Sequence, residues 1–376
     1  MNLSIPFFFS ISLYKLYKSP KIYIVNAPSD YGGIYLETRK VQVIGGSTFT
    51  VSLPKKWAVE QKLKHGDNMY LWPQLDGSMV LRTEGSREAE PGRLRKFKID
   101  SFEPEHLLRE LIGSYISGFE LIELSAVKRI SPELREIIRE FIRITIGPEI
   151  IDESLNKIVL QDFIDPSELS LKKGVRRMYL IAKSMHTDAL TAFKERNTEL
   201  ANDIISRDAE VDRFFWLISK QFNLVLTGRE LRIESGMRLE DSMDYYLVAR
   251  IIERIADHAG KISENIIHLG KNKIPAGNVR RLNDIHKHYL DMLEMATLAF
   301  FNSRSDEANK AIDRTMELHH VCDSSLSETL DLDSSIAISV AYIIESMRRT
   351  GMYATDISEI AINHIVSKSV GSRKKQ

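Results

Sequence analysis

The sequence predicts a mainly α-helical protein in which a small strand-rich unit and a small α+β segment precede two three-helix bundles in tandem. Three observations lead to this fold class. Beyond about residue 170 apolar residues recur with a helical period over long stretches. Before residue 84, short alternating runs lie between glycine-containing turns, as strands do. Between residues 94 and 165 strand and helix patterns alternate, as in an α+β unit.

Composition limits the classes of protein that remain. The 376 residues suffice for two or three domains, each with its own core. The 52 basic and 52 acidic residues balance, so any attraction to nucleic acid must come from a local basic patch. A single cysteine, Cys322, excludes an intramolecular disulfide, and the 10 histidines lack the spacing of a structural zinc site. We expect a cytoplasmic protein.

The start of the chain carries one apolar run, from Ile5 to Tyr14. The run is too short to span a bilayer, and no basic residue precedes it as in a signal peptide. We therefore expect residues 1–35 to lie outside the folded domains, with no membrane insertion. A segment that associates with a membrane is the alternative.

The strand-rich unit should cover residues 36–84. Alternating runs at Thr48–Leu53 and Met69–Trp72 are bounded by Gly45-Gly46 and by a second turn at Gly66-Asp67. Between them Pro54 suits the start of a short helix, because its missing N–H is not needed there. The expected order is strand, strand, helix, strand, strand.

This order resembles the SpoVT/AbrB family of swapped-hairpin DNA-binding domains. The resemblance is carried by GGSTFTVSLPKKW, from Gly45 to Trp57, by the Gly66-Asp67 pair and by a closing hairpin around Asp76-Gly77. It implies that two chains interleave into one small β-barrel, hence a homodimer, and that promoter DNA is a partner. The residues that it implies as DNA contacts are Arg39, Lys40, Ser47 and Thr48, with Lys55 and Lys56 as phosphate partners.

Charge alone does not identify this unit as a DNA-binding domain. Residues 36–84 hold seven Lys or Arg against five Asp or Glu, a net charge of +2. Dimerisation would double the patch, and several cations on the DNA backbone supply most non-specific affinity. An ordinary solvated barrel surface is the alternative interpretation.

The middle segment, residues 94–165, reads as a small α+β unit with well-marked helix starts. Ser131 suits an N-cap, and Pro132 suits the first helical position. Its acids and bases alternate as on a solvated helix face, and no catalytic constellation is evident. We expect a spacer or sensing role, and we expect that the chain is not an enzyme.

The helical part shows signs of duplication. Asn202–Asp212 aligns without gaps on Asn309–His319, and Ala259–Glu264 aligns on Ala354–Glu359. Two copies of a three-helix bundle, residues 171–270 and 276–368, are the simplest account. The expected helices cover residues 171–195, 199–226, 239–269, 278–302, 306–330 and 333–367.

The third helix carries a more specific resemblance. The text ARIIERIADHAGKISENI, from Ala249 to Ile266, with RDAEVD before it, resembles the PhoU repeat, and the order of modules resembles archaeal phosphate-uptake regulators with an AbrB-like head. The resemblance implies work in phosphate transport, with a phosphate ABC transporter ATPase or a sensor protein as partner. It also implies Glu/Asp-x-x-x-Asp motifs that hold multinuclear iron or zinc clusters.

Two carboxylate pairs match that motif: Asp208 with Asp212, and Glu253 with Asp257. Each pair stands at i, i+4, where like charges destabilise a helix. Arg250 and Lys261 flank only the second pair, for which a plain salt-bridged face would suffice. Four carboxylates from neighbouring helices could also hold a divalent metal.

The second copy departs from this pattern. Its aligned positions hold no carboxylate, so we expect one metal site per chain; they are Thr315, His319, Arg348 and Met352. The function that we expect is transcriptional regulation of phosphate uptake, with a DNA-binding head and a sensing helical module. An adaptor that docks on a phosphate transporter or its sensor without binding DNA is the first alternative, and a metal-binding protein is the second.

Overall fold

The computed structural model describes residues 38–73, 79–83, 93–164, 169–227, 237, 239–270, 272 and 274–372. The chain divides into two compact units, Met1–Ala89 and Glu90–Gln376, and each is described by itself. The expected N-terminal extension, residues 1–35, and the Asp76-Gly77 turn lie outside the described residues.

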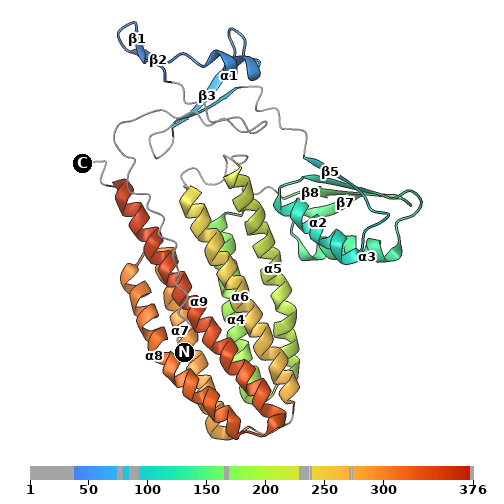
Figure 1. Cartoon of the computed structure of the whole chain (residues 1–376), viewed down its shortest axis with the longest axis vertical. Coiled ribbons are helices and arrows are strands. Elements are labelled where there is room, and N and C mark those ends of the chain that lie inside the picture. The colour runs from blue at the N-terminus through green and yellow to red at the C-terminus, as the bar shows by residue number, and fades with distance from the viewer. Residues whose placement is uncertain are drawn as a thin grey trace, which may run out of the picture. The chain divides into compact units, whose positions relative to one another are not determined.

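The described residues of unit 1 form two antiparallel hairpins and one short helix (Figure 1). Gly45 and Gly46 have φ values of 63° and 80°, as the tight turn of the first hairpin requires. The order of elements is the expected one. They are β1 (Gln42–Ile44), β2 (Thr48–Thr50), α1 (Lys55–Glu60), β3 (Met69–Pro73) and β4 (Met79–Thr83).

The predicted β-barrel is not closed in this chain. Among the described residues β1 pairs with β2 and β3 pairs with β4, which leaves two separate two-stranded sheets. A barrel needs an unbroken ring of hydrogen-bonded strands, and these short hairpins are too few to form one. In a swapped-hairpin arrangement the remaining strands belong to a second chain, so a single chain cannot complete the ring.

The middle segment of unit 2 is an α+β layer structure. Its sheet has the order β5-β6-β8-β7, in which β5 and β6 are parallel and the other pairs are antiparallel. Two helices pack on one face of this sheet (Figure 1). The elements are β5 (Leu94–Lys98), α2 (Pro104–Ile116), β6 (Leu121–Ser125), α3 (Pro132–Ile144), β7 (Pro148–Glu153) and β8 (Lys157–Asp162).

The predicted cap of α3 is confirmed, because the Ser131 hydroxyl accepts a hydrogen bond from the Leu134 amide at 3.2 Å. The core between sheet and helices centres on fully buried Leu111, Ile138 and Phe141. Strand β7 was not predicted. It completes the edge of the sheet next to β8.

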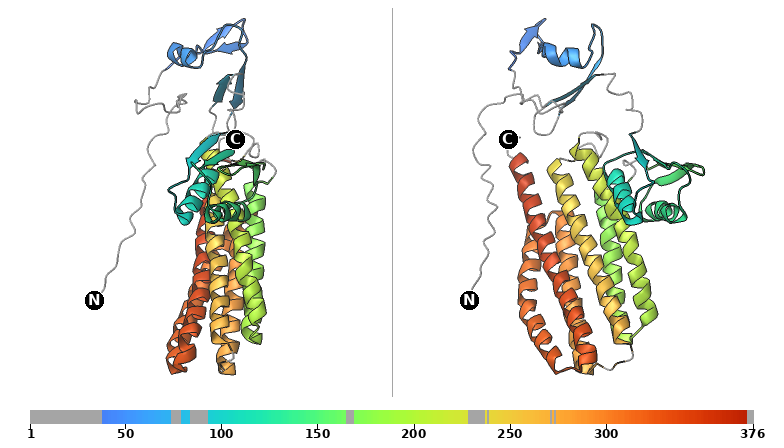
Figure 2. Two further views of the ribbon diagram at one scale, coloured as in Figure 1. Left: turned by 90° about the vertical axis from the view of Figure 1, so that its right-hand side faces the viewer. Right: turned by 45° about the vertical axis from the view of Figure 1, so that its right-hand side comes forward.

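The rest of unit 2 consists of long helices that run side by side (Figure 2). The first three pack on one another, as do the last three, and α6 packs along α9. One continuous hydrophobic core therefore runs through both bundles. The helices are α4 (Leu171–Glu195), α5 (Thr198–Leu226), α6 (Leu239–Leu269), α7 (Ala276–Asn302), α8 (Ser305–Ser327) and α9 (Ser334–Ser372), with a 3₁₀ turn, η2 (Glu328–Asp331), after α8.

The helix boundaries follow local sequence chemistry. The Asn197 side chain accepts a hydrogen bond from the Leu200 amide at 3.0 Å and starts α5. Arg196 and Ser303 adopt left-handed φ values of 59° and 56°, which end α4 and α7. In the part of the chain that the structure describes, no helix has the length and apolar character that a membrane span requires.

Helix α5 joins the α+β layers to the bundles, because α2 and α3 both pack on it. Trp216 contacts both hydrophobic cores. Lys220 forms an ion pair with Asp162 in which both side chains are almost fully buried, and the Asn223 amide donates to the carbonyl of Ile116 at 3.0 Å. Removal of one partner of such a pair would leave a buried charge without its counter-ion, which is strongly destabilising.

Candidate functional site

The structure brings together the two carboxylate pairs, Asp208 and Asp212 on α5 with Glu253 and Asp257 on α6. We call these four residues the carboxylate cluster. All four side chains are half-buried, since α5 and α6 pack closely here. Partial burial of several like charges raises carboxylate pKa values.

The acid groups of this cluster repel one another. Burial raises the pKa of Asp208 to about 7, with further contributions from the charges of Asp212, Asp257 and Glu253. Burial, with the charges of Asp257 and Asp212, raises the pKa of Glu253 to about 7. The pKa of Asp212 rises to about 6 through burial and Asp257, and burial raises the pKa of Asp257 as well.

Flanking cations do not neutralise the cluster. Arg250 and Lys261 lower the pKa values of Glu253 and Asp257, but the net shift of both remains upward. Among the described residues neither Glu253 nor Asp257 forms an ion pair with these cations. Asp208 also has a buried carboxylate oxygen, Oδ1, without a hydrogen-bond partner.

These features fit a cation. The donors are hard oxygens, which suit Mg, Mn, Fe and Zn, and a bound ion would remove the repulsion and satisfy Oδ1 of Asp208. Among the described residues, however, no three of these carboxylates bring oxygens within 4.8 Å of one another. Metal binding here would therefore draw α5 and α6 side chains closer together.

At the aligned positions the second bundle has no acids, and the polar side chains described there form hydrogen bonds. Thr315 is buried and donates its hydroxyl to the carbonyl of Ala311 at 2.8 Å. Arg348 forms hydrogen bonds of 2.7 and 2.9 Å with both oxygens of Glu345. Met352 is half-buried. That the chain has one metal site stays a prediction.

The predicted DNA contacts all lie on the surface of unit 1. Three groups share this exposure: residues that precede β1, residues at the β1–β2 turn and residues that open α1. They are Arg39 and Lys40, then Ser47 and Thr48, then Lys55 and Lys56. Their exposure leaves them accessible to a polyanion.

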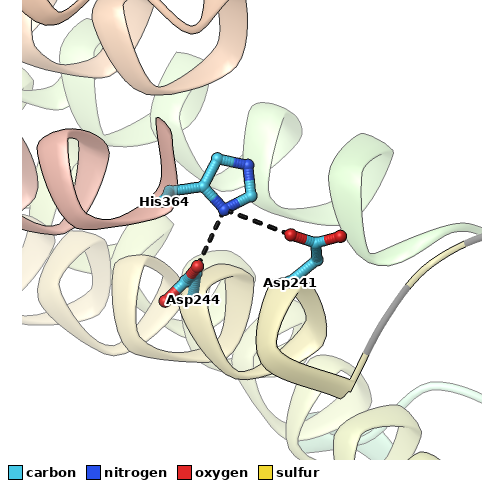
Figure 3. Close-up of side chains that lie close together, drawn as sticks. All are labelled: Asp241, Asp244 and His364. Carbon is cyan, nitrogen blue, oxygen red and sulfur yellow. Dashed lines mark hydrogen bonds and ion pairs between the residues drawn. The ribbon is translucent and has the colours of Figure 1, made fainter. Parts of the chain in front are cut away.

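Sequence reasoning missed a second cluster, in which Asp241 and Asp244 of α6 face His364 of α9 (Figure 3). Nδ1 of His364 lies 2.7 Å from Oδ2 of Asp244 and 3.5 Å from Oδ1 of Asp241. The acids at i, i+3 were the only signal in the sequence. Nothing local pointed to a histidine 120 residues away.

A buried histidine pair was also missed. Nδ1 of His186 on α4 lies 2.9 Å from Nε2 of His286 on α7, and both rings are fully buried. Burial lowers the pKa of His186 to about 4, so the pair is neutral near pH 7. It joins the first bundle to the second.

Comparison with protein families finds a match over the first bundle. The PhoU domain family matches residues 175–266. The match begins inside α4 and ends near the end of α6, so the PhoU domain coincides with the bundle that carries the carboxylate cluster.

Two curated relatives also match. Each is named "Phosphate-specific transport system accessory protein PhoU homolog", from two strains of Streptococcus pneumoniae, and is 24% identical over 98 residues. The alignment covers 26% of this chain and 43% of each relative, which is less than half of the relative's own length.

Two solved structures resemble the chain. PhoU from Pseudomonas aeruginosa has a TM-score of 0.48 and 19% identity, over 53% of this chain and 96% of that one. The phosphate transport system regulatory protein PhoU from Streptococcus pneumoniae has a TM-score of 0.44 and 16% identity, over 51% of this chain and 91% of that one.

Proposed function

We propose that this chain is a cytoplasmic, dimeric regulator of phosphate uptake that binds promoter DNA through unit 1 and receives the phosphate signal through its helical bundles. The observation that carries the proposal is the PhoU domain match over residues 175–266. The chain attaches this domain to a separate unit with exposed cations, which a regulator of transcription needs.

The helical bundles are the sensing part of this proposal. The carboxylate cluster would hold a divalent ion or an iron or zinc cluster through Asp208, Asp212, Glu253 and Asp257. Support comes from the unpartnered Oδ1 of Asp208 and from the raised pKa values of the group. The partner on the transport side would be a phosphate ABC transporter ATPase or a sensor protein.

The DNA-binding role of unit 1 rests on its exposed cations. Lys55 and Lys56 open α1, and Arg39 and Lys40 precede β1. Each cation that neutralises a DNA phosphate releases a counterion, so affinity of this kind falls steeply with salt. Ser47 and Thr48, at the β1–β2 turn, would add hydrogen bonds to the DNA backbone.

A homodimer would complete the fold of unit 1. Neither hydrophobic core includes a described residue of this unit. Eight of its large apolar side chains are instead 43% to 75% exposed, which is costly in water unless another surface covers them. They are Val41, Val43, Ile44, Phe49, Val51, Val59, Leu71 and Met79.

The test is binding of the full chain to DNA from upstream of its own gene, measured by fluorescence anisotropy across a salt series. We expect log K to fall linearly with log salt concentration. Lys55→Glu with Lys56→Glu should weaken binding at least about tenfold and flatten that slope. Lys62→Glu with Lys64→Glu is the matched control, because it makes the same charge change on exposed lysines of unit 1.

Absence of any salt-dependent binding would reject the DNA-binding role. Binding of the chain to a phosphate transporter ATPase in the same preparation would then favour the adaptor. Equal losses in the two lysine double variants would show that only net charge matters and that α1 is not the contact surface.

A further inference from the structure

Figure 3 shows Asp241, Asp244 and His364, which lie together where α6 of the first bundle packs along α9 of the second. Asp241 and Asp244 lie in the first two turns of α6, and His364 lies near the end of α9. One ligand atom from each of these residues lies within 4.8 Å of the other two. Asp241 is twelve residues from Glu253, about 18 Å along the helix.

The imidazole is held firmly in this position. The side chain of His364 is 2% exposed, while those of Asp241 and Asp244 are 11% and 21% exposed. Its ring packs edge-on against Tyr245 of α6 and at a tilt against Phe300 of α7, with centroid distances of 6.2 and 5.1 Å. Ligands whose rotamers are fixed by packing lose little entropy when they bind an ion.

Both carboxylates approach the same imidazole nitrogen. Nδ1 of His364 lies 2.7 Å from Oδ2 of Asp244, at hydrogen-bond distance. Oδ1 of Asp241 points at the same nitrogen from 3.5 Å, beyond the usual hydrogen-bond distance. A cation in place of the hydrogen-bonding proton could bind the nitrogen and both oxygens at once.

We propose that Asp241, Asp244 and His364 form a three-ligand site for a divalent transition-metal ion, with Zn²⁺ as the first candidate. One imidazole with two carboxylates suits zinc, iron or manganese better than magnesium or calcium, which prefer oxygen alone. Three protein ligands leave a coordination position for water or for an external group.

Because of the position of the site, a bound ion would affect the stability of the fold. Helix α6 belongs to the first bundle and α9 to the second, and the two pack along each other. An ion held by both helices would fasten the bundles together at this end. Binding that occurs only in the folded state stabilises that state, and the stabilisation grows with the logarithm of the metal concentration once this exceeds the Kd.

The experiment uses the full chain, purified without a histidine tag and freed of metal with a chelator. Asp208→Asn with Asp212→Asn provides a background in which the carboxylate cluster is impaired. Zn²⁺ is titrated by calorimetry, and Co²⁺ is added separately because its visible absorption reports protein ligands. We expect one Zn²⁺ per chain in this background.

Asp244→Asn and His364→Gln should each lower Zn²⁺ affinity by at least about tenfold and abolish the Co²⁺ absorption. His268→Gln is the matched control, because His268 is an exposed histidine of α6, and it should change neither readout. Circular dichroism checks each variant for folding; if His364→Gln does not fold, Asp244→Asn carries the test.

Two outcomes would overturn the site. The background chain could bind no Zn²⁺ at all, or it could bind Zn²⁺ equally well with Asp244 or His364 replaced. In the first case the three residues are only a hydrogen-bonded clamp between α6 and α9. Neither outcome touches the DNA-binding test of the proposed function, so the two can fail separately.

Discussion

The two helical bundles share a fold but differ in how they treat charge at aligned positions. In the first, Asp208, Asp212, Glu253 and Asp257 face one another without ion pairs among the described residues, and burial raises the pKa of each. In the second, the hydroxyl of buried Thr315 donates a hydrogen bond to a carbonyl of its own helix, and Arg348 donates a hydrogen bond to Glu345. The fold therefore does not need the acids.

This difference indicates where function resides. Partly buried carboxylates that repel one another destabilise the bundle that holds them. Their presence at these positions therefore indicates a functional role rather than a contribution to folding. The second bundle shows the alternative, in which every group at the aligned positions with a described side chain is apolar, hydrogen-bonded or ion-paired. The first bundle is also the one that matches the PhoU domain.

The largest effect should come from removing ligands of the first bundle. Asp212→Ala with Asp257→Ala should abolish the metal that the carboxylate cluster retains through purification, because each helix loses one of its two carboxylates. Elemental analysis of the untagged chain measures this. Asp323→Ala with Asp331→Ala, at exposed acids of the second bundle, is the control and should retain all metal. Unchanged metal in the first variant would contradict the assignment.

Packing offers the next contrast. A Cβ at Gly351 of α9 would collide with the ring of Tyr289 on α7, so Gly351→Ala should destabilise the chain by about 1–3 kcal/mol. At Gly260 of α6 a Cβ would meet nothing within 4 Å, so Gly260→Ala should stabilise the chain by about 0.5–1 kcal/mol. Urea unfolding measures both. Equal effects would mean that the second bundle is not packed as tightly as described.

A pH series on the metal-free chain tests the repulsion itself. The pKa of Asp208 is about 7 in the folded chain against an ordinary value of 3.8, so the folded state binds the proton more tightly. Stability should therefore fall as pH rises from about 4 to about 7 and stay low above it. Asp208→Asn should stabilise the chain by about 1 kcal/mol near pH 8 and change little near pH 4. A destabilised variant near pH 8 would contradict this account.

The stability that the ion pairs of the second bundle contribute should change with pH in the opposite direction and by a smaller amount. Arg348 and Arg349 lower the pKa of Glu345 by hydrogen bonds, against the opposing effect of burial. Glu345→Gln should cost about 0.5 kcal/mol at neutral pH. The loss should disappear as the pH falls from the ordinary value of 4.5 through the lowered pKa of Glu345 in the folded chain, because the carboxylate then takes up its proton. Thermal unfolding at two pH values measures it, and a stabilised variant would reverse the contrast.

Much of the fold could be predicted because helices are encoded locally. The predicted start of α5, for example, differs from the observed one by a single residue, since Asn197 is a strong N-cap. Strand β7 was missed because Ile150 and Ile151 are adjacent rather than alternating, and a register shift follows them in the pairing with β8. The barrel could not be tested within one chain, because its ring would need strands from a second copy.

The candidate sites also include contacts that the sequence could predict and contacts that it could not. The meeting of Asp208 with Glu253 could be inferred, because both pairs have i, i+4 spacing on consecutive helices. The degree to which these carboxylates are buried could not be inferred, since burial depends on how α5 packs against α6 and on the side chains between them. His364 meets Asp244 across 120 residues, a contact that only the tertiary fold creates.

The most direct test of the central claim is the occupancy of DNA by the chain in its native cells, mapped by chromatin immunoprecipitation in phosphate-rich and phosphate-starved cultures. We predict enrichment upstream of phosphate-transport genes that changes with phosphate supply. Lys55→Glu with Lys56→Glu should remove the enrichment, and Asp208→Asn with Asp212→Asn should remove only its response to phosphate. No enrichment under either condition would contradict a DNA-binding regulator.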